Sequence, residues 1–283
     1  MAVKDPPALP AQESSPGHPA PYGVSYDVTD AVAVIELRGP ADGNALDGHM
    51  RSALLMAARR LTTATARGVR AALITGRGRH FCVGQDLKEH ARLLKTAPAT
   101  AFANLPNDYN PLVKELHALQ IPLVVAVEGA CVGAGLGLAL CADVRVAAEG
   151  ARFATAFTGI GLASDSGVAR ALARQLGPSR TAGIMLLGER FSAQDAQRWG
   201  LVHRVVPDGS AAAEGLALAH ALAEGPTAAY REIKALLRSA ASVPLPEALE
   251  REAVVQRRLG ATDDHHEAVT AFLERRGPDF HGR

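Results

Sequence analysis

The stretch IPLVVAVEGACVGAGLGLAL, residues 121–140, decides the fold predicted for this chain. Its segment Leu123–Val127 is a short run of apolar, mostly β-branched residues, which is typical of a buried strand. The glycine-rich loop Glu128–Gly137 follows, and the apolar run Leu136–Cys141 indicates that the loop opens into a buried helix. The first amides of a helix lack partners and carry positive potential, so the loop suits a developing negative charge.

Two other interpretations of this loop compete with charge stabilisation. In the first, Gly133, Gly135 and Gly137 only allow the helix to pack tightly, and glycine spacing alone does not separate the two roles. In the second, the loop binds a dinucleotide. The glycines form G-x-G-x-G rather than G-x-G-x-x-G, and no strand ends in an acidic residue about 20 positions later, which disfavours a dinucleotide site.

The same strand-then-loop pattern occurs earlier in the chain. Ala71–Thr75 (AALIT) predicts a strand, and the loop Gly76–Lys88 (GRGRHFCVGQDLK) follows it. A further strand is predicted at Ala31–Leu37. Apolar residues at helical spacing mark helices at Leu46–Ala64 and Tyr109–Leu119. Strands that alternate with helices indicate an α/β protein.

After residue 140 the alternation of strands and helices continues with one more strand and one more helix. A strand is predicted at Val144–Ala147 and a helix at Val168–Leu176, after which the chain reads as almost wholly helical. Ser192 and Asp195 have the spacing of a capping box, so a short helix is expected to start there and end near Trp199.

The expected organisation has three parts. Residues 1–23 are rich in proline and predict a disordered tail, residues 24–200 form the core, and residues 201–283 form a C-terminal helical region. No repeat of about 20 to 50 residues and no low-complexity linker separates the core from the helical region. The two are therefore expected to pack as one unit.

Composition narrows the class of partner. The chain has 283 residues, of which 48% are hydrophobic and 21% charged, as in an ordinary globular protein. Thirty Lys and Arg against 29 Asp and Glu leave a net charge of +1, so there is no basic excess to bind nucleic acid. The apolar run Ile121–Val127 is strand-sized and far shorter than the roughly 20 residues of a membrane helix. We expect a small-molecule partner, no nucleic acid and no membrane.

The cysteines and histidines predict neither disulfides nor a metal. Cys82, Cys131 and Cys141 are odd in number and lack C-x-x-C spacing, which suits a reducing cytoplasm. The adjacent pair His265 and His266 lies in a charged helical stretch, where a solvated face is the simpler interpretation. We therefore expect a cytoplasmic protein with no metal site.

Several ordered motifs together resemble the crotonase (enoyl-CoA hydratase/isomerase) superfamily. They are HFCVGQDL, IPLVVAVEGACVGAG, CADVRVAAEGARF, GLASDSGVAR and FSAQDAQRWGLVHRVV, and the resemblance runs from about Val24 to the end of the chain. It implies a spiral of ββα units, a C-terminal helical region that forms trimers, and a pocket for a coenzyme A thioester. A homotrimer or a dimer of trimers is expected on this basis. Coenzyme A would be part of the substrate, so no separate cofactor is expected.

The resemblance also assigns roles to individual residues. The main-chain amides of Gln85 and Ala134 would form the oxyanion hole for the thioester carbonyl. Asp86, Leu87 and Lys88 would lie along the coenzyme A moiety, with Lys88 near its phosphates. For Lys88 the alternative is an ordinary solvated loop charge.

The two glutamates that hydratases of the family use are absent. Matching the motifs puts Gly137 and Phe157 at their positions, and neither residue can transfer a proton. The remaining acid is Asp165 in GLASDSG, a position that dienoyl-CoA isomerases and the ring-epoxide/oxepin isomerases of phenylacetate breakdown fill with an acid. The latter group is the most similar, although Ser164 replaces a proline and Val168 a glycine of its turn. The alternative role for Asp165 is to cap the following helix.

These residues predict an enoyl-CoA isomerase. One carboxylate would move a proton between the α- and γ-carbons of the acyl thioester while paired amides hold the dienolate oxygen. Such a base needs an apolar setting, which the side chains of Phe153, Phe157, Ile160 and Leu162 are expected to supply. The alternatives are an enoyl-CoA hydratase, another crotonase chemistry such as hydrolysis or decarboxylation, and a non-catalytic protein that binds acyl-CoA.

Overall fold

A computed structural model of the chain describes residues 22–39 and 43–283. The predicted tail at residues 1–23 lies almost entirely outside the described residues. The strands are β1 (Gly23–Thr29), β2 (Val32–Arg38), β3 (Ala71–Gly76), β4 (Leu123–Val127), β5 (Ala130–Val132), β6 (Val144–Ala148), β7 (Arg152–Ala154), β8 (Phe191–Ser192) and β9 (Arg204–Val206). The helices are α1 (Gly48–Ala64), α2 (Leu87–Thr96), α3 (Asn110–Ala118), α4 (Ala134–Leu140), α5 (Val168–Leu176), α6 (Pro178–Leu187), α7 (Ala193–Arg198), α8 (Ala211–Ala223), α9 (Thr227–Ser239), α10 (Leu245–Leu259) and α11 (Asp263–Glu274).

In the described part of the chain, six strands form the main sheet in the order β1-β2-β3-β4-β6-β9. Only β1 runs antiparallel to its neighbour, and the pairs from β2 to β9 are parallel. Strand β4 lies near the centre and all five of its residues are buried, which explains its unbroken apolar sequence.

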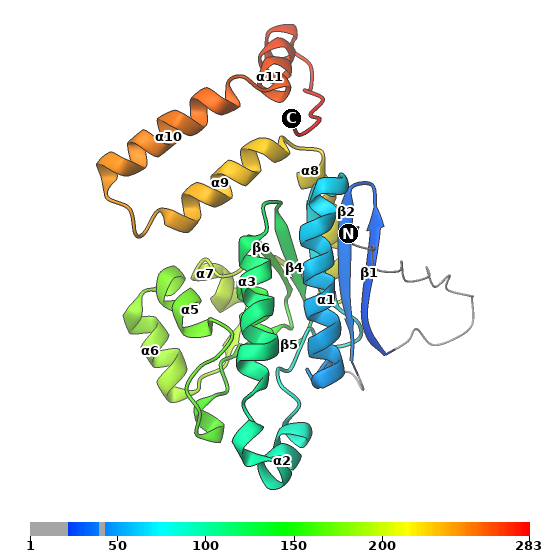
Figure 1. Cartoon of the computed structure of the whole chain (residues 1–283), viewed down its shortest axis with the longest axis vertical. Helices are drawn as coiled ribbons and strands as arrows, with labels where there is room; N and C mark the ends of the chain where they lie inside the picture. The colour runs from blue at the N-terminus through cyan, green and yellow to red at the C-terminus, as the bar shows by residue number, and fades with distance from the viewer. Residues whose placement is uncertain (1–21, 40–42) are drawn as a thin grey trace, which may run out of the picture.

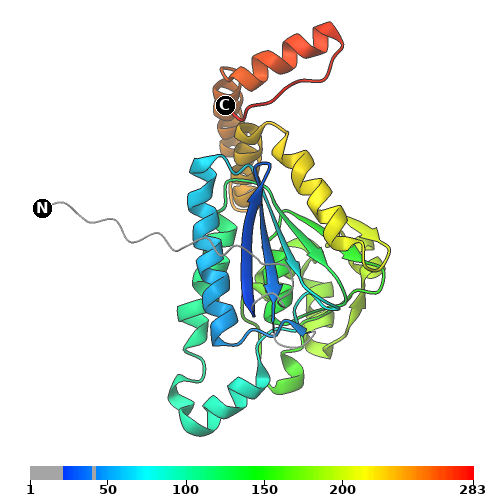
Figure 2. The ribbon, with the colours of Figure 1, turned by 90° about the vertical axis from the view of Figure 1, so that its right-hand side faces the viewer.

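The two faces of the main sheet bury different sets of side chains. On β4, Val125 belongs to the core under α1 and α3, while Val124 and Ala126 belong to the core under α8. Figure 2 shows α1 on one side of the sheet and α8 on the other. Helix α8 comes very close to the sheet at Gly215, where an added Cβ would lie 2.9 Å from Cβ of Ala126. The alternation along each strand therefore builds a three-layer core.

A second, smaller sheet contains β5, β7 and β8. The chain leaves the main sheet at the end of β4, enters this sheet at β5 and then forms helix α4. Cys82, after β3, makes a parallel bridge to Cys131 of β5, so the loop after β3 joins the small sheet in the same way. This repeated strand, strand and helix confirms the predicted α/β fold with a spiral of ββα units.

Local signals in the sequence fix several element boundaries. Asp47 caps α1 by accepting a hydrogen bond from the amide of Met50. The predicted capping box is confirmed, because Ser192 and Asp195 bond each other's main chain at the start of α7, which ends at Arg198.

The structure also contains strands that the sequence patterns did not predict. These are β1, β5, β8 and β9, which are two to seven residues long. The expectation of an almost wholly helical chain after Leu176 is therefore wrong at β8 and β9. Strand β9 pairs with β6 in the main sheet, and α8 packs on β3, β4 and β6. The first part of the region 201–283 thus contributes to the core of the sheet.

Helices α9, α10 and α11 extend away from the sheet, at the top of Figure 1. Lys234 of α9 is buried and links this region to the core, because its Nζ donates to Ile121 O at 2.7 Å and to the carboxylate of Asp143. Arg70 adds a second link by donating to Thr227 Oγ1 and Phe280 O, each at 2.9 Å. Among the described helices, none has the length and apolar character that crossing a bilayer requires.

Candidate active site

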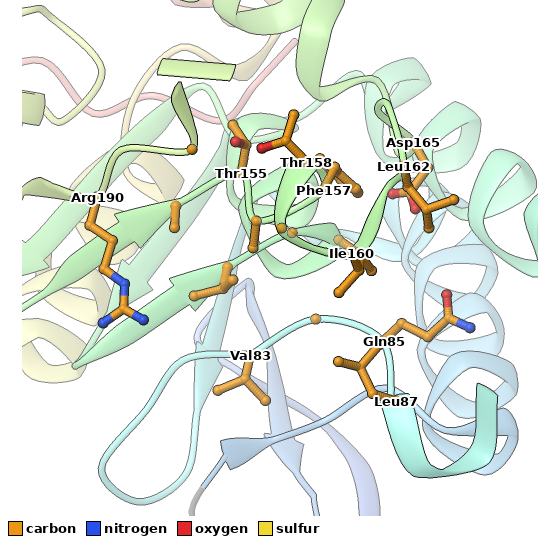
Figure 3. Close-up of a pocket in the computed structure, with 18 of the residues that line it drawn as sticks. Val83, Gln85, Leu87, Thr155, Phe157, Thr158, Ile160, Leu162, Asp165 and Arg190 are labelled. Atoms are coloured by element: carbon orange, nitrogen blue, oxygen red, sulfur yellow. The ribbon is translucent and has the colours of Figure 1, made fainter. Parts of the chain in front are cut away.

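A cavity of about 610 Å³ lies where the two glycine-bearing loops meet the segment after β7. Figure 3 shows side chains from these segments around it. Its volume is within the range of small-molecule sites. The side chains that line it are mainly apolar and include Val83, Leu87, Val132, Phe157, Ile160, Leu162, Leu186 and Leu187. The polar side chains come from Gln85, His90, Thr155, Thr158, Asp165 and Arg190.

Main-chain contacts hold the two loops together. Cys82 N donates to Ala130 O at 3.1 Å, and Val132 N donates to Cys82 O at 2.9 Å. Gly84 has a φ of +88°, and a Cβ on it would lie 2.8 Å from Val132 O and 3.4 Å from Ala134 N. Only glycine allows the loops to approach this closely with that backbone conformation.

This arrangement directs two amides at the cavity. Leu46 bonds the main chain of Gly84 and Asp86, on either side of Gln85, so the amide of Gln85 points away from Leu46. Ala134 is the first residue of α4, where an amide has no partner within the helix. Neither amide donates to main chain of the described residues. Gln85 and Ala134, the predicted oxyanion pair, are thus brought to one cavity.

Asn44 keeps the first loop in this position. It is buried, and its Nδ2 donates to His80 O at 2.8 Å and to Arg77 O at 3.0 Å, while its Oδ1 accepts from Gly39 N at 2.7 Å. The sequence offered no signal for this role, because the loop carbonyls that Asn44 binds lie more than 30 positions away.

The glycines of the second loop serve the tight packing considered from the sequence and also shape the backbone. Gly133 has a φ of +56°, which shapes the turn before α4. A Cβ at Gly135 would lie 2.4 Å from Cys82 O, and a Cβ at Gly137 would lie 2.5 Å from Cβ of Ser166. Tight packing is therefore required at Gly135 and Gly137, and backbone shape is required at Gly133.

Asp165 is partly buried and lines the cavity, next to the position that Gly137 fills. Burial raises the pKa of its carboxyl, and a 2.8 Å hydrogen bond from Ser166 Oγ to its Oδ1 opposes the rise. Among the described residues that line the cavity, Asp165 carries the only carboxylate. Of the four side chains expected to give Asp165 an apolar setting, Phe157, Ile160 and Leu162 line the cavity. Phe153 does not line it and stacks on Phe191 instead.

The alternative role of Asp165 as a helix cap is wrong. Gly167 is the N-cap of α5, and the side chain of Asp165 does not bond the helix. Instead, Ser164 Oγ accepts from Ala169 N at 3.1 Å. The carboxylate of Asp165 is thus left available to the cavity.

The three residues predicted to lie along coenzyme A sit at the start of α2. Asp86 is the N-cap and its Oδ1 accepts from the amides of Lys88 and Glu89, at 2.8 and 2.9 Å. Leu87 is exposed and lines the cavity. Lys88 is exposed on the first turn of the helix and does not line the cavity.

The sequence did not single out several of the cavity-lining residues, among them Thr155, His90 and Arg190. Thr155 is 1% exposed, and its hydroxyl is sealed with no hydrogen-bond partner among the described residues. His90 of α2 is buried at 8% exposed. Arg190 is the only cation that lines the cavity within the described chain, and Figure 3 places it at the end opposite Asp165 and Gln85. Tertiary packing brings these residues to the cavity, and no sequence motif indicates that they line it.

Nothing in the described residues resembles a metal site or a reactive thiol. No group of three or more His, Cys, Asp or Glu side chains is arranged to hold a metal ion within residues 22–39 and 43–283. The three cysteines are free, and burial raises the pKa of Cys82 and of Cys141 to about 12. A thiol with so high a pKa is a poor nucleophile.

Comparison with known proteins agrees with this geometry. Residues 27–283 match the family model for enoyl-CoA hydratase/isomerase. A Rhodobacter capsulatus protein assigned as an enoyl-CoA hydratase is 41% identical over 93% of this chain and 99% of its own length. The 1,2-epoxyphenylacetyl-CoA isomerase of Escherichia coli is 40% identical over 76% of this chain and 82% of its own length.

A solved Mycobacterium abscessus structure assigned to the enoyl-CoA hydratase/isomerase group has a TM-score of 0.89 and 49% identity. The similarity covers 92% of this chain and 100% of that one. With a family match along nearly the whole described chain and a spiral of ββα units around a cavity between two loops, the chain belongs to the enoyl-CoA hydratase/isomerase family, the crotonase superfamily.

Proposed function

We propose that this protein is an enoyl-CoA isomerase that shifts a double bond in an acyl-CoA thioester, with Asp165 as its acid and base. The observation that carries the proposal is that Asp165 is the only carboxylate lining the cavity among the described residues, and that Gln85 and Ala134 line the same cavity. Moving a double bond between the 3,4 and 2,3 positions needs one proton carrier and no water.

The proposed reaction proceeds in two proton transfers. The carboxylate of Asp165 removes a proton from the α-carbon, and the electron pair moves through the thioester to give a dienolate. The amides of Gln85 and Ala134 hold the dienolate oxygen, and such donors contribute roughly 3 to 4 kcal/mol each in comparable sites. Asp165 then returns the proton to the γ-carbon.

The surroundings of Asp165 suit this role. Its pKa is raised by burial, so its carboxylate is a stronger base than one in water. Below the raised pKa the carboxyl is protonated and cannot remove the α-proton, so the rate is expected to fall with falling pH. Ser166 donates a hydrogen bond to the Asp165 carboxylate. This bond orients the carboxylate and lowers its basicity.

Hydration is the second candidate, because the Rhodobacter capsulatus relative is assigned as a hydratase. Two features of the site argue against it. Gly137 packs against Ser166 with no room for a side chain, and Phe157 offers the cavity an apolar ring. Neither position supplies a group that activates water.

The proposal extends to the coenzyme A moiety and the assembly. Leu87 lines the cavity, and Asp86, Leu87 and Lys88 at the start of α2 are proposed to lie along coenzyme A, which the substrate itself brings. We propose a homotrimer or a dimer of trimers that forms through the C-terminal helices. In support, Leu245 and Phe272 are 70% and 81% exposed, and exposed apolar surface of this kind marks interfaces. A cytoplasmic location is proposed because the three cysteines are free.

The experiment that tests the proposal replaces the carboxylate alone. Asp165→Asn should lower the isomerisation of a 3-enoyl-CoA by about 10²- to 10⁴-fold, measured by the absorbance of the conjugated product. Acyl-CoA affinity should change little. Glu189→Gln is the matched control, because Glu189 is exposed next to Arg190 but does not line the cavity, and it should keep full activity.

Three outcomes would contradict the proposal. Unchanged turnover in Asp165→Asn would remove Asp165 from the reaction. Faster formation of a 3-hydroxyacyl-CoA from a 2-enoyl-CoA than isomerisation of the 3-enoyl-CoA, measured by chromatography, would favour the hydratase. Tight acyl-CoA binding without turnover of any enoyl-CoA would favour a non-catalytic binding protein.

A further inference from the structure

His90 is a buried polar group in the cavity that the proposed reaction does not use. It lies in the second turn of α2, is 8% exposed and lines the cavity. Its ring packs edge-on against Phe102, with the ring centroids 5.0 Å apart. A polar group that is buried in this way normally has a hydrogen-bond partner for each of its donors.

One ring nitrogen of His90 is accounted for within the protein. Gln85 Nε2 lies 3.2 Å from His90 Nδ1. With Gln85 Nε2 as the donor, Nδ1 accepts this bond, and in that tautomer the ring proton sits on Nε2. Gln85 therefore fixes the tautomer of His90 and holds its ring in place.

The other nitrogen has no partner. Among the described residues no acceptor bonds His90 Nε2. Nε2 is also not one of the buried atoms that are both sealed from solvent and unpartnered, a set that includes the hydroxyl of Thr155. His90 lines the cavity, so the cavity lies beside its ring.

We propose that His90 Nε2–H is a specificity subsite that donates a hydrogen bond to an oxygen on the acyl chain of the substrate. The proposal rests on the proposed function in one respect, which is that the cavity holds an acyl-CoA. Gln85 presents its main-chain amide to the thioester oxygen and its side chain to His90, so the acceptor oxygen lies on the part of the acyl chain near the thioester. The substrate class is an acyl-CoA with an ether, hydroxyl or carbonyl oxygen in its chain.

The binding free energy depends on whether the Nε2–H donor of His90 finds an acceptor in the substrate. A plain hydrocarbon chain in the cavity would cover the Nε2–H donor and leave it without a partner, which costs free energy. An oxygen at the right position would satisfy the donor. Sites built around a hydrogen-bonding group therefore reject analogues that lack its partner more strongly than apolar pockets reject an extra methylene.

The test compares acyl-CoAs that cannot react and differ by one atom. Hexanoyl-CoA and its analogues with an ether oxygen in place of C3 or C5 are bound to the full-length protein, and their Kd values are measured by calorimetry. For one analogue, the ratio of the hexanoyl-CoA Kd to the analogue Kd should be about five- to tenfold larger in the wild type than in His90→Phe or His90→Met. His90→Gln, which keeps a donor, should retain much of the ratio.

Phe102→Leu is the matched control, because it changes the packing against the imidazole while keeping the donor, and it should leave the ratio unchanged. Equal Kd ratios in the wild type, His90→Phe and His90→Met would overturn the proposal. Two variants without the donor, His90→Phe and His90→Met, are used so that poor folding of one does not decide the result. If the wild type isomerises no 3-enoyl-CoA but still prefers the oxygen-containing analogue, the proposed reaction is contradicted and the subsite is supported.

Discussion

The partial burial of Asp165 carries a cost in folding stability. Burial raises the pKa of its carboxyl above the ordinary value of 3.8. Below pH 3.8 the group is protonated in both folded and unfolded states, so burial carries no charge penalty. As the pH rises through the raised pKa, the folded state must hold a partly buried charge and loses stability relative to the unfolded state.

This linkage predicts that Asp165→Asn, which is neutral at every pH, is more stable than the wild type at neutral pH. The difference in melting temperature should shrink as the pH is lowered toward about 4. Differential scanning calorimetry at several pH values measures it. An Asp165→Asn variant that melts at or below the wild-type temperature at pH 7 would contradict the assigned burial penalty.

Gly84 sets the distance between the two amides of the proposed oxyanion hole. In Gly84→Ala the new Cβ would meet Val132 O at 2.8 Å, and the φ of +88° would be strained. We expect the loops to separate and kcat for isomerisation to fall by roughly 10²- to 10³-fold, as when an oxyanion donor is lost. Steady-state kinetics with a 3-enoyl-CoA measures the effect.

Gly183→Ala provides the control for Gly84→Ala. Gly183 lies within α6, and an added Cβ meets no atom within 4 Å. Activity should be kept, and stability should rise by about 0.5 to 1 kcal/mol because alanine is the better helix former. A Gly84→Ala variant as active as Gly183→Ala would show that the close approach at Gly84 does not matter to the reaction.

At the scale of elements, the capping box of α7 shows how a local motif places a boundary. Ser192 Oγ accepts from Asp195 N at 3.0 Å, and Asp195 Oδ2 accepts from Ser192 N at 3.1 Å. Ser192 is also the last residue of β8, so the same residue ends a strand and starts a helix.

Ser192→Ala should therefore lower the free energy of unfolding by about 1 kcal/mol, with little effect on acyl-CoA affinity. Ser210→Ala is the matched control. Ser210 is the N-cap of α8 but its side chain makes no capping hydrogen bond, so its replacement should cost close to nothing. Equal losses in the two variants, measured by urea unfolding, would show that the capping box contributes nothing specific.

Some of the strands that the sequence did not predict depend on distant partners. Strands β5 and β9 have three residues each, too few for a clear period, and they exist because β7 and β6 pair with them. Strand β4, by contrast, has five buried apolar residues and was predicted at its observed bounds. Short strands are specified by their neighbours, whereas long or strongly apolar ones carry their own signal.

At the scale of the whole molecule, the C-terminal helices carry apolar side chains that no part of the described chain covers. Phe272 and Leu273 of α11 are 81% and 75% exposed. Helices α9 to α11 project from the body of the protein in both Figure 1 and Figure 2. This is the surface through which we propose self-association.

Phe272→Asp should weaken that assembly, because a carboxylate would have to be buried in an apolar contact. Light scattering coupled to size-exclusion chromatography should give a smaller mass than for the wild type. Met56→Asp is the control, since Met56 is 60% exposed on α1, away from these helices, and its mass should match the wild type. A wild type that elutes as a monomer at every concentration would refute the proposed assembly.

The sequence by itself determined the α/β class, the central strands, the capping box and, through the family resemblance, the residues that meet at the cavity. Those features are encoded locally, in apolar periodicity and glycine spacing over a few residues. Tertiary structure alone decided that Asp165 lines the cavity instead of capping α5, that Gly137 has no room for a side chain, and that His90 lines the cavity with its Nδ1 beside Gln85. Each of these depends on which distant segment packs against the residue, because burial and hydrogen bonding are set by neighbours in space.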